Sequence, residues 1–268
     1  MGGVIQDLVN AIASSLSFTT DGLIASLKFG QSLYNNLKPF LAWFASLALI
    51  LAIIYFIIEM DRLILLNRNV GMKELAAPLF KFGFAMVIIL NGNWVMSMVL
   101  DFWNGSLNWM ETYLAGAHTD VITGNYTFNG GGFFTLVALL IPMLLMWLAS
   151  LIVSLIWRFK GIVFKFKFLF RVMFLPIACA DIYNLHNSTT IRYIKGTLAL
   201  GVAVVGFIAL PTVGGWVFAD MLGASWNAAS GSGSGWEVLE AMLDFILVPI
   251  AELAAVNVIE QFAKEALQ

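Results

Sequence analysis

Long runs of apolar residues that contain no charged side chain recur along the whole chain. Residues 40–58 form a run of 19 without Asp, Glu, Lys or Arg, and residues 133–157 form a run of 25. About 20 apolar residues in a helix cross the hydrocarbon core of a bilayer. The pattern predicts about five membrane-spanning helices, at roughly 40–58, 77–100, 133–157, 197–219 and 236–259.

The segments around these spans are more polar. Residues 1–38 carry apolar and polar positions at helical spacing, which predicts an amphipathic N-terminal segment that lies at the membrane interface or packs on a neighbouring subunit. A second helix is expected over 23–37, ended by Pro39. Residues 158–180 are apolar but strongly basic, which predicts a re-entrant or interfacial helix. Residues 260–268 are read as a C-terminal tail, which leaves 39–259 as the transmembrane domain.

Composition supports this interpretation. The chain of 268 residues is 60% hydrophobic and 11% charged, with a mean hydropathy of +0.89, whereas an average soluble domain is about 25% charged. The expected fold class is an all-α, polytopic bundle of membrane helices. Cys179 is the single cysteine, so no disulfide can form within the chain, and a small buried side chain is the simplest role for it.

The positions of Lys and Arg predict the orientation in the membrane. None occurs between residues 82 and 157, or between 196 and 263, whereas residues 59–76 and 158–195 are basic. Cytoplasmic loops carry an excess of Lys and Arg. We therefore expect 59–76 and 158–195 in the cytoplasm, and the N-terminus, 101–132 and 220–235 on the outer side.

The basic residues of the middle segment are the main candidate site. If they lie on a helix, Lys160, Lys167 and Arg171 share one face, and Arg158 and Lys165 lie on nearly the opposite face. Three interpretations remain open: cytoplasmic anchors, the inner end of a polar pathway, or contacts to phospholipid headgroups. The full set of basic candidate residues expected on the cytoplasmic side is Arg158, Lys160, Lys165, Lys167, Arg171, Arg192 and Lys195.

Two further patterns are weaker. Glu237, Glu240 and Asp244 share a helical face, which fits either the outer funnel of a polar pathway or a solvated helix end. Small residues at positions 215, 219 and 223 would let two helices approach closely, unless the row arises by chance in a Gly-rich protein. These residues are Gly215, Ala219 and Gly223.

The sequence offers no catalytic pair of nucleophile and base, so we do not expect an enzyme. His118 and His186 have no further metal ligands at useful spacing, so we expect no metal site. No cofactor is expected apart from bound phospholipid.

The stretch FRVMFLPIACADIYNLHNSTTIRYIKGTLAL combines Arg171, Pro176-Ile-Ala, Ala180-Asp-Ile-Tyr and Arg192-Tyr-Ile-Lys before an apolar span. It resembles the corresponding stretch of the TrbL-type conjugal transfer proteins, polytopic inner-membrane components of type IV secretion systems. The motif covers about 30 residues, and outside it the likeness is one of hydropathy.

The resemblance implies a non-enzymatic channel or scaffold subunit in the bacterial cytoplasmic membrane. Such a subunit would form a homo-oligomeric ring beside the secretion ATPases and help DNA or protein cross. Implied partners are membrane lipids, other copies of the chain, other secretion components and translocated single-stranded DNA. A lipid-binding assembly protein and a small secondary transporter are the alternatives.

Overall fold

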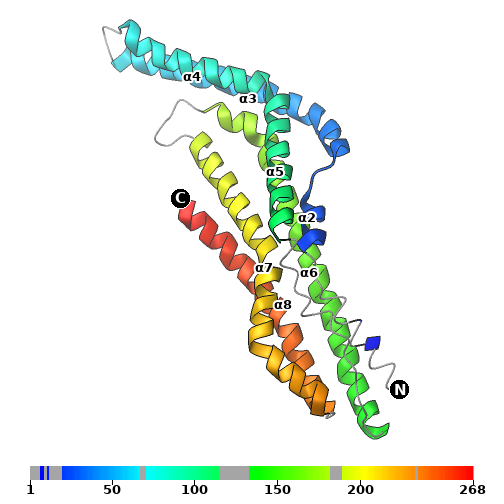
Figure 1. Cartoon of the computed structure of the whole chain (residues 1–268). Coiled ribbons are helices and arrows are strands. Elements are labelled where there is room, and N and C mark those ends of the chain that lie inside the picture. The colour runs from blue at the N-terminus through cyan, green and yellow to red at the C-terminus, as the bar shows by residue number, and fades with distance from the viewer. Residues whose placement is uncertain are drawn as a thin grey trace. The chain divides into compact units, whose positions relative to one another are not determined.

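The computed structural model describes residues 7–8, 11, 20–66, 71–114, 133–181, 189–232 and 235–267. Within them the regular structure consists of helices α2 (Thr20–Leu27), α3 (Gln31–Leu66), α4 (Met72–Leu90), α5 (Gly92–Leu114), α6 (Phe133–Cys179), α7 (Thr189–Ser232) and α8 (Gly235–Leu267) (Figure 1).

The chain divides into two compact units, each built from several stretches of sequence. The first unit comprises residues 1–27, 108–163 and 203–262, and the second comprises 28–107, 164–202 and 263–268. Helices α5, α6, α7 and α8 each contribute residues to both.

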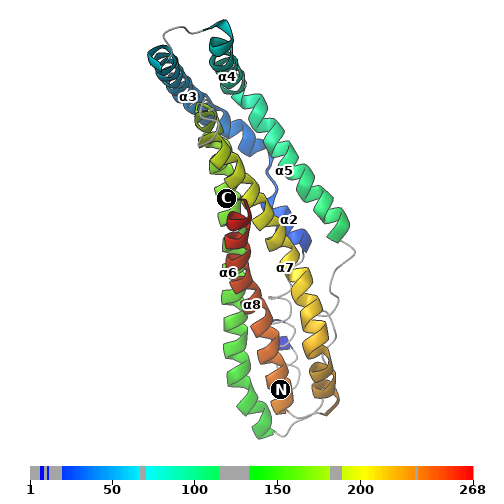
Figure 2. The ribbon, with the colours of Figure 1, turned by 90° about the vertical axis from the view of Figure 1, so that its left-hand side faces the viewer.

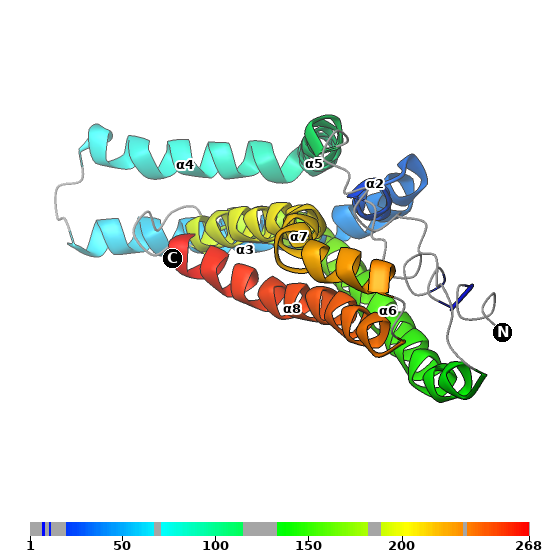
Figure 3. The same cartoon turned by 60° about the horizontal axis from the view of Figure 1, so that its bottom comes forward.

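In the second unit, α3 and α4 run side by side as a hairpin (Figures 1 and 3). Ala48 and Ala52 of α3 are fully buried against Ile89 of α4 and against Ala180. Small side chains let helices approach closely inside a membrane, where dispersion contacts replace the hydrophobic effect as the source of helix association. The hairpin is therefore held by close backbone packing.

The span predicted at 77–100 is two helices. Helix α4 ends at Leu90, and α5 departs at an angle of 73° (Figure 1). The Asn91 backbone N–H and its side-chain Nδ2 both donate to the Val87 carbonyl, at 3.1 and 2.8 Å, so Asn91 closes α4. Asparagine and glycine together at 91–92 are a turn signal inside an apolar run, and here that signal outweighs hydropathy.

Helix α5 continues to Leu114, so the first part of the polar connection predicted at 101–132 is helical. Its buried side chains recur at spacings of three and four, which is one helix face. Polar residues on the opposite face lowered the hydropathy of the segment and hid this pattern. The buried set is Met96, Leu100, Trp103, Leu107 and Met110.

The basic segment 158–180, predicted as a separate element, is the second half of α6, which runs unbroken for 47 residues. Phe164, Phe168 and Val172 are buried at intervals of four, so this half has a regular apolar face. At about 1.5 Å per residue the helix is about 70 Å long, more than twice the thickness of a hydrocarbon core. The helix is therefore long enough for its basic half to extend beyond the hydrocarbon core that its apolar half would cross.

In the first unit, α8 packs beside α6 and α7 (Figure 2). The rings of Trp157 on α6 and Phe207 on α7 stack with their centres 4.9 Å apart. A Cβ added to Gly206 of α7 would lie 2.6 Å from Ile259 of α8, so glycine sets this close approach.

Other boundaries also differ from the sequence-based expectations. Pro39 lies inside α3, although it was expected to end a helix over 23–37; prolines persist in membrane helices where neighbours satisfy the freed backbone groups. Helix α7 extends through the Gly/Ser-rich stretch to Ser232, and α8 includes the expected tail through Leu267. Apart from residues 7–8 and 11, the amphipathic pattern before residue 20 lies outside the described residues.

Within the described ranges, four helices are long and apolar enough to cross a membrane, and a fifth candidate is the bent α4–α5 pair. Large apolar side chains on them are exposed, including Trp43 at 60%, Ile57 at 60% and Leu145 at 63%. Continuous apolar surface of this kind requires a lipid environment. The chain is therefore a multi-pass, helical membrane protein.

Candidate functional site

The seven basic residues singled out from the sequence are divided between the two units. Two belong to the first unit, and the remaining five, on α6 and the start of α7, belong to the second unit. The first pair is Arg158 and Lys160, and the five are Lys165, Lys167, Arg171, Arg192 and Lys195.

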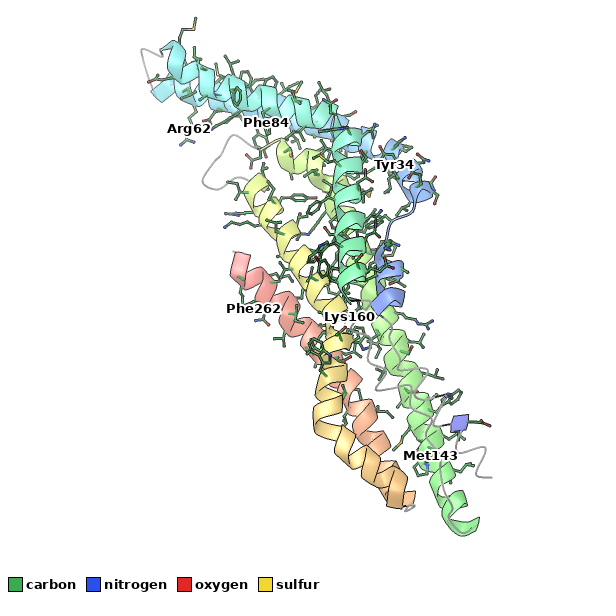
Figure 4. The ribbon with its side chains drawn as sticks, viewed as in Figure 1. Tyr34, Arg62, Phe84, Met143, Lys160 and Phe262 are labelled. Carbon is green, nitrogen blue, oxygen red and sulfur yellow. The ribbon has the colours of Figure 1, made fainter. Side chains whose placement is uncertain are left out.

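In the first unit, Lys160 is half-buried and joins two helices. Its ammonium group donates to Asn257 Oδ1 on α8 at 2.8 Å. Figure 4 labels Lys160. Arg158, two residues earlier, is exposed. A charged donor on a neutral acceptor makes a comparatively strong hydrogen bond, so Lys160 contributes to the attachment of α8 to α6.

In the second unit, Lys165 binds non-helical backbone. Helix α2 ends at Leu27 and α3 begins at Gln31, and the Lys165 ammonium group donates to the Lys28 carbonyl between them at 2.7 Å. The same ammonium lies 5.3 Å from the centre of the Phe29 ring. Carbonyl groups beyond a helix C-terminus lack intrahelical partners and favour a nearby cation.

Asn104 of α5 binds the same connection. Its Oδ1 accepts from the Phe29 N–H at 2.9 Å, and its Nδ2 donates to the Phe29 carbonyl at 3.1 Å. Phe29 also packs against Trp103 and Phe168, whose own rings stack 3.9 Å apart. We call the contacts of Asn104 and Lys165 with residues 28–29 the backbone brace.

Arg171 joins α6 to α7. Its Nη1 lies 3.4 Å from the Tyr193 carbonyl and 3.5 Å from Thr197 Oγ1, and its guanidinium lies 5.8 Å from the Tyr193 ring. A Cβ at Gly196 would fall 2.6 Å from that Nη1, so glycine makes room for the guanidinium.

Side-chain hydrogen bonds link the end of α6 to the start of α7. Asp181 Oδ2 accepts from the Thr189 N–H at 3.1 Å and from the Thr189 hydroxyl, which caps the N-terminus of α7. The buried Thr190 hydroxyl donates to the Ala178 carbonyl at 2.6 Å. We call these contacts, with those of Arg171, the α6–α7 clasp.

The other three members of the basic set in the second unit are Lys167, Arg192 and Lys195. The Lys167 ammonium is 5.5 Å from the centre of the Phe164 ring. Arg192 and Lys195 are exposed on the first turns of α7, and their spacing of three places them on one face. Lys165 and Arg171, by comparison, are half-buried and bind backbone carbonyls within the unit.

The two weaker sequence patterns cannot be followed to side-chain contacts. Glu237, Glu240 and Asp244 lie on helix α8, and the row of small residues at 215, 219 and 223 lies on α7. Their side chains are outside the part of the chain that the structure describes. Both patterns stay predictions.

Sequence reasoning missed Asn104, Asp181 and Glu252 as site residues. Asn104 fell in an expected loop, although the spacing of its apolar neighbours was a helical signal. Asp181 stood in the quoted motif, eight residues before Thr189, too far apart to suggest a cap. Glu252 lies within the span predicted at 236–259, and periodicity alone could not show that its side chain packs next to Gly214 of α7.

Among the described residues, no group of three or more His, Cys, Asp and Glu side chains is placed to hold a metal ion. The fold and the site define a multi-pass membrane protein with an exposed basic pair, Arg192 and Lys195, on the first turns of α7, next to the α6–α7 clasp. No protein-family model, curated protein or solved structure matches the chain.

Proposed function

We propose that the protein is a non-enzymatic membrane subunit of a conjugative type IV secretion system, which helps DNA or protein substrate cross the bacterial cytoplasmic membrane. In this proposal the chain acts as a homo-oligomer, and the α6–α7 hairpin faces the cytoplasm. The exposed pair Arg192 and Lys195 receives an anionic partner, such as a nucleic-acid backbone or an acidic surface of a secretion ATPase.

The observation that carries the proposal is the concentration of cations around the α6–α7 hairpin of an otherwise apolar protein. Two long stretches, 82–157 and 196–263, contain no Lys or Arg. A local positive charge attracts phosphate backbones without reading base sequence. The hairpin is also the stretch that carries the family resemblance.

The contacts of the clasp support a division of labour within this hairpin. Arg171 and Asp181 are engaged with backbone and hydroxyl groups of α7, so they give the hairpin a fixed geometry. Arg192 and Lys195 then project from a positioned helix start. A docking surface on a positioned element requires less ordering when a partner binds.

A charge-exchange experiment tests the proposal. We expect the double substitution Arg192→Gln/Lys195→Gln to lower conjugative transfer at least tenfold, at an unchanged amount of protein in the membrane. The matched control, Lys38→Gln/Lys264→Gln, also removes two exposed positive charges but outside the hairpin, and should transfer normally. Equal transfer by both variants would remove the basic pair from the mechanism.

The oligomeric state provides a separate test. Purified protein in lipid nanodiscs should form a ring of several copies, visible in projection by electron microscopy. A stable monomer would contradict the channel or scaffold role, and a monomer that retains phospholipid through purification would favour the lipid-binding alternative.

A further inference from the structure

Glu252 is a carboxyl group placed in the packed seam between two apolar helices. It lies in α8, inside the candidate membrane span Ile246–Ala266, and is 9% exposed. Its side chain fills the space next to Gly214 of α7: a Cβ on Gly214 would overlap the Glu252 carboxyl group. Any larger residue at 214 would therefore displace this carboxyl.

The residues that share the face of Glu252 on α8 are apolar, and the buried polar side chains on α6 and α7 of this unit, Ser150, Ser154 and Thr212, carry no charge. On α8, Val256 and Ile259 follow at spacings of four and seven, and so share its face; Val256 is 1% exposed, and Ile259 packs at Gly206 of α7. On α7, residues 203–216 contain no titratable side chain. An ionised carboxylate is costly in such a place, which favours the protonated acid.

One positively charged side chain of this unit contacts α8. The Lys160 ammonium on α6 binds Asn257 of α8, five residues beyond Glu252, a rise of about 7.5 Å along the helix. The other charged residues of the packed elements in this unit are Arg158 on α6 and Glu260 on α8, with Asp220, Glu237, Glu240 and Asp244 on parts of α7 and α8 whose side chains are not described.

We propose that the Glu252 carboxyl group is an exchangeable proton-binding site in the α7–α8 seam. Burial between the two packed helices stabilises its protonated form. Exchange transfers one proton between the carboxyl oxygen and water and changes no other bond. This inference does not depend on the secretion role proposed above, because it rests on the seam alone.

Dicyclohexylcarbodiimide, an apolar reagent that reacts with protonated carboxyl groups, tests the proposal on the full-length protein in detergent. The acid proton moves to a carbodiimide nitrogen as the carboxyl oxygen bonds to the central carbon. Peptide mass spectrometry would follow labelling from about pH 5 to about pH 10. We expect labelling at Glu252 that falls about tenfold per pH unit above its midpoint, and none in Glu252→Gln.

Matched variants separate this site from general acid reactivity. Glu265→Gln, which removes an exposed acid farther along α8, should leave the Glu252 label unchanged. Gly214→Ala should reduce the label several-fold, whereas Gly201→Ala, where an added Cβ meets no atom within 4 Å, should not. If the wild-type label were constant over the whole pH range, or absent at about pH 5, the proposal would be overturned, whether or not the variants fold.

Discussion

At the scale of single residues, side chains in this protein replace missing backbone hydrogen bonds. Residues 28–30 separate α2 from α3. Asn104 binds the N–H and the carbonyl of Phe29, and Lys165 binds the carbonyl of Lys28. Unsatisfied backbone groups are expensive in a low-dielectric interior. The brace therefore explains why a polar amide and a cation are kept among the aromatic rings around Phe29.

Asn104→Ala should lower the free energy of unfolding by about 1–3 kcal/mol, because it leaves the N–H and the carbonyl of Phe29 without their partner. Asn104→Asp should have a smaller effect, since its oxygen still accepts from the N–H. Thermal unfolding in detergent, followed by circular dichroism, measures both. Asn108→Ala removes an exposed amide one turn later and should change stability by no more than about 0.5 kcal/mol; equal losses at 104 and 108 would refute the brace.

Some of these residue-scale features could be predicted from the sequence. It identified the basic residues as a group and noted the opposed faces of Lys167 and Lys165, but it could not show which cations bind internal carbonyls. Those partners come from distant segments: Lys165 reaches a residue 137 positions away, and Asn104 one 75 positions away. Periodicity reports which face a residue occupies and carries no information on long-range partners.

At the scale of elements, hydropathy located the apolar cores of the helices but not their ends. Helix α6 continues through its cations because Phe164, Phe168 and Val172 keep one face apolar and because Lys165 and Arg171 have internal partners. At Asn91 the opposite happens, and a local turn signal divides an uninterrupted apolar run. Charge alone does not end a helix, and hydropathy alone does not continue one.

Hydrogen–deuterium exchange tests the continuity of α6. Amides from 155 to 170 should exchange slowly and without interruption in detergent micelles, because each is bonded to a carbonyl one turn earlier. The turn at residue 91 provides the internal comparison, and amides 91–93 should exchange faster than those of α4 and α5 on either side. A fast-exchanging break near 158–161 would instead favour a separate re-entrant element.

At the scale of the whole molecule, we propose a multi-pass protein whose α6–α7 hairpin lies in the cytoplasm. The apolarity of the described helices indicates the membrane class, while the orientation is a prediction from the distribution of Lys and Arg. The proposed function depends on that orientation, because Arg192 and Lys195 can meet a cytoplasmic partner only from the inner side.

Cysteine accessibility measures that orientation most directly. The native Cys179 is first replaced by Ala, and a cysteine is introduced by Arg192→Cys or, as the comparison, by Asp120→Cys in the segment expected outside. A membrane-impermeant maleimide should label position 192 in inverted vesicles and not in intact cells, and position 120 in intact cells. Labelling of position 192 from outside intact cells would contradict the orientation and the cytoplasmic docking role of the hairpin.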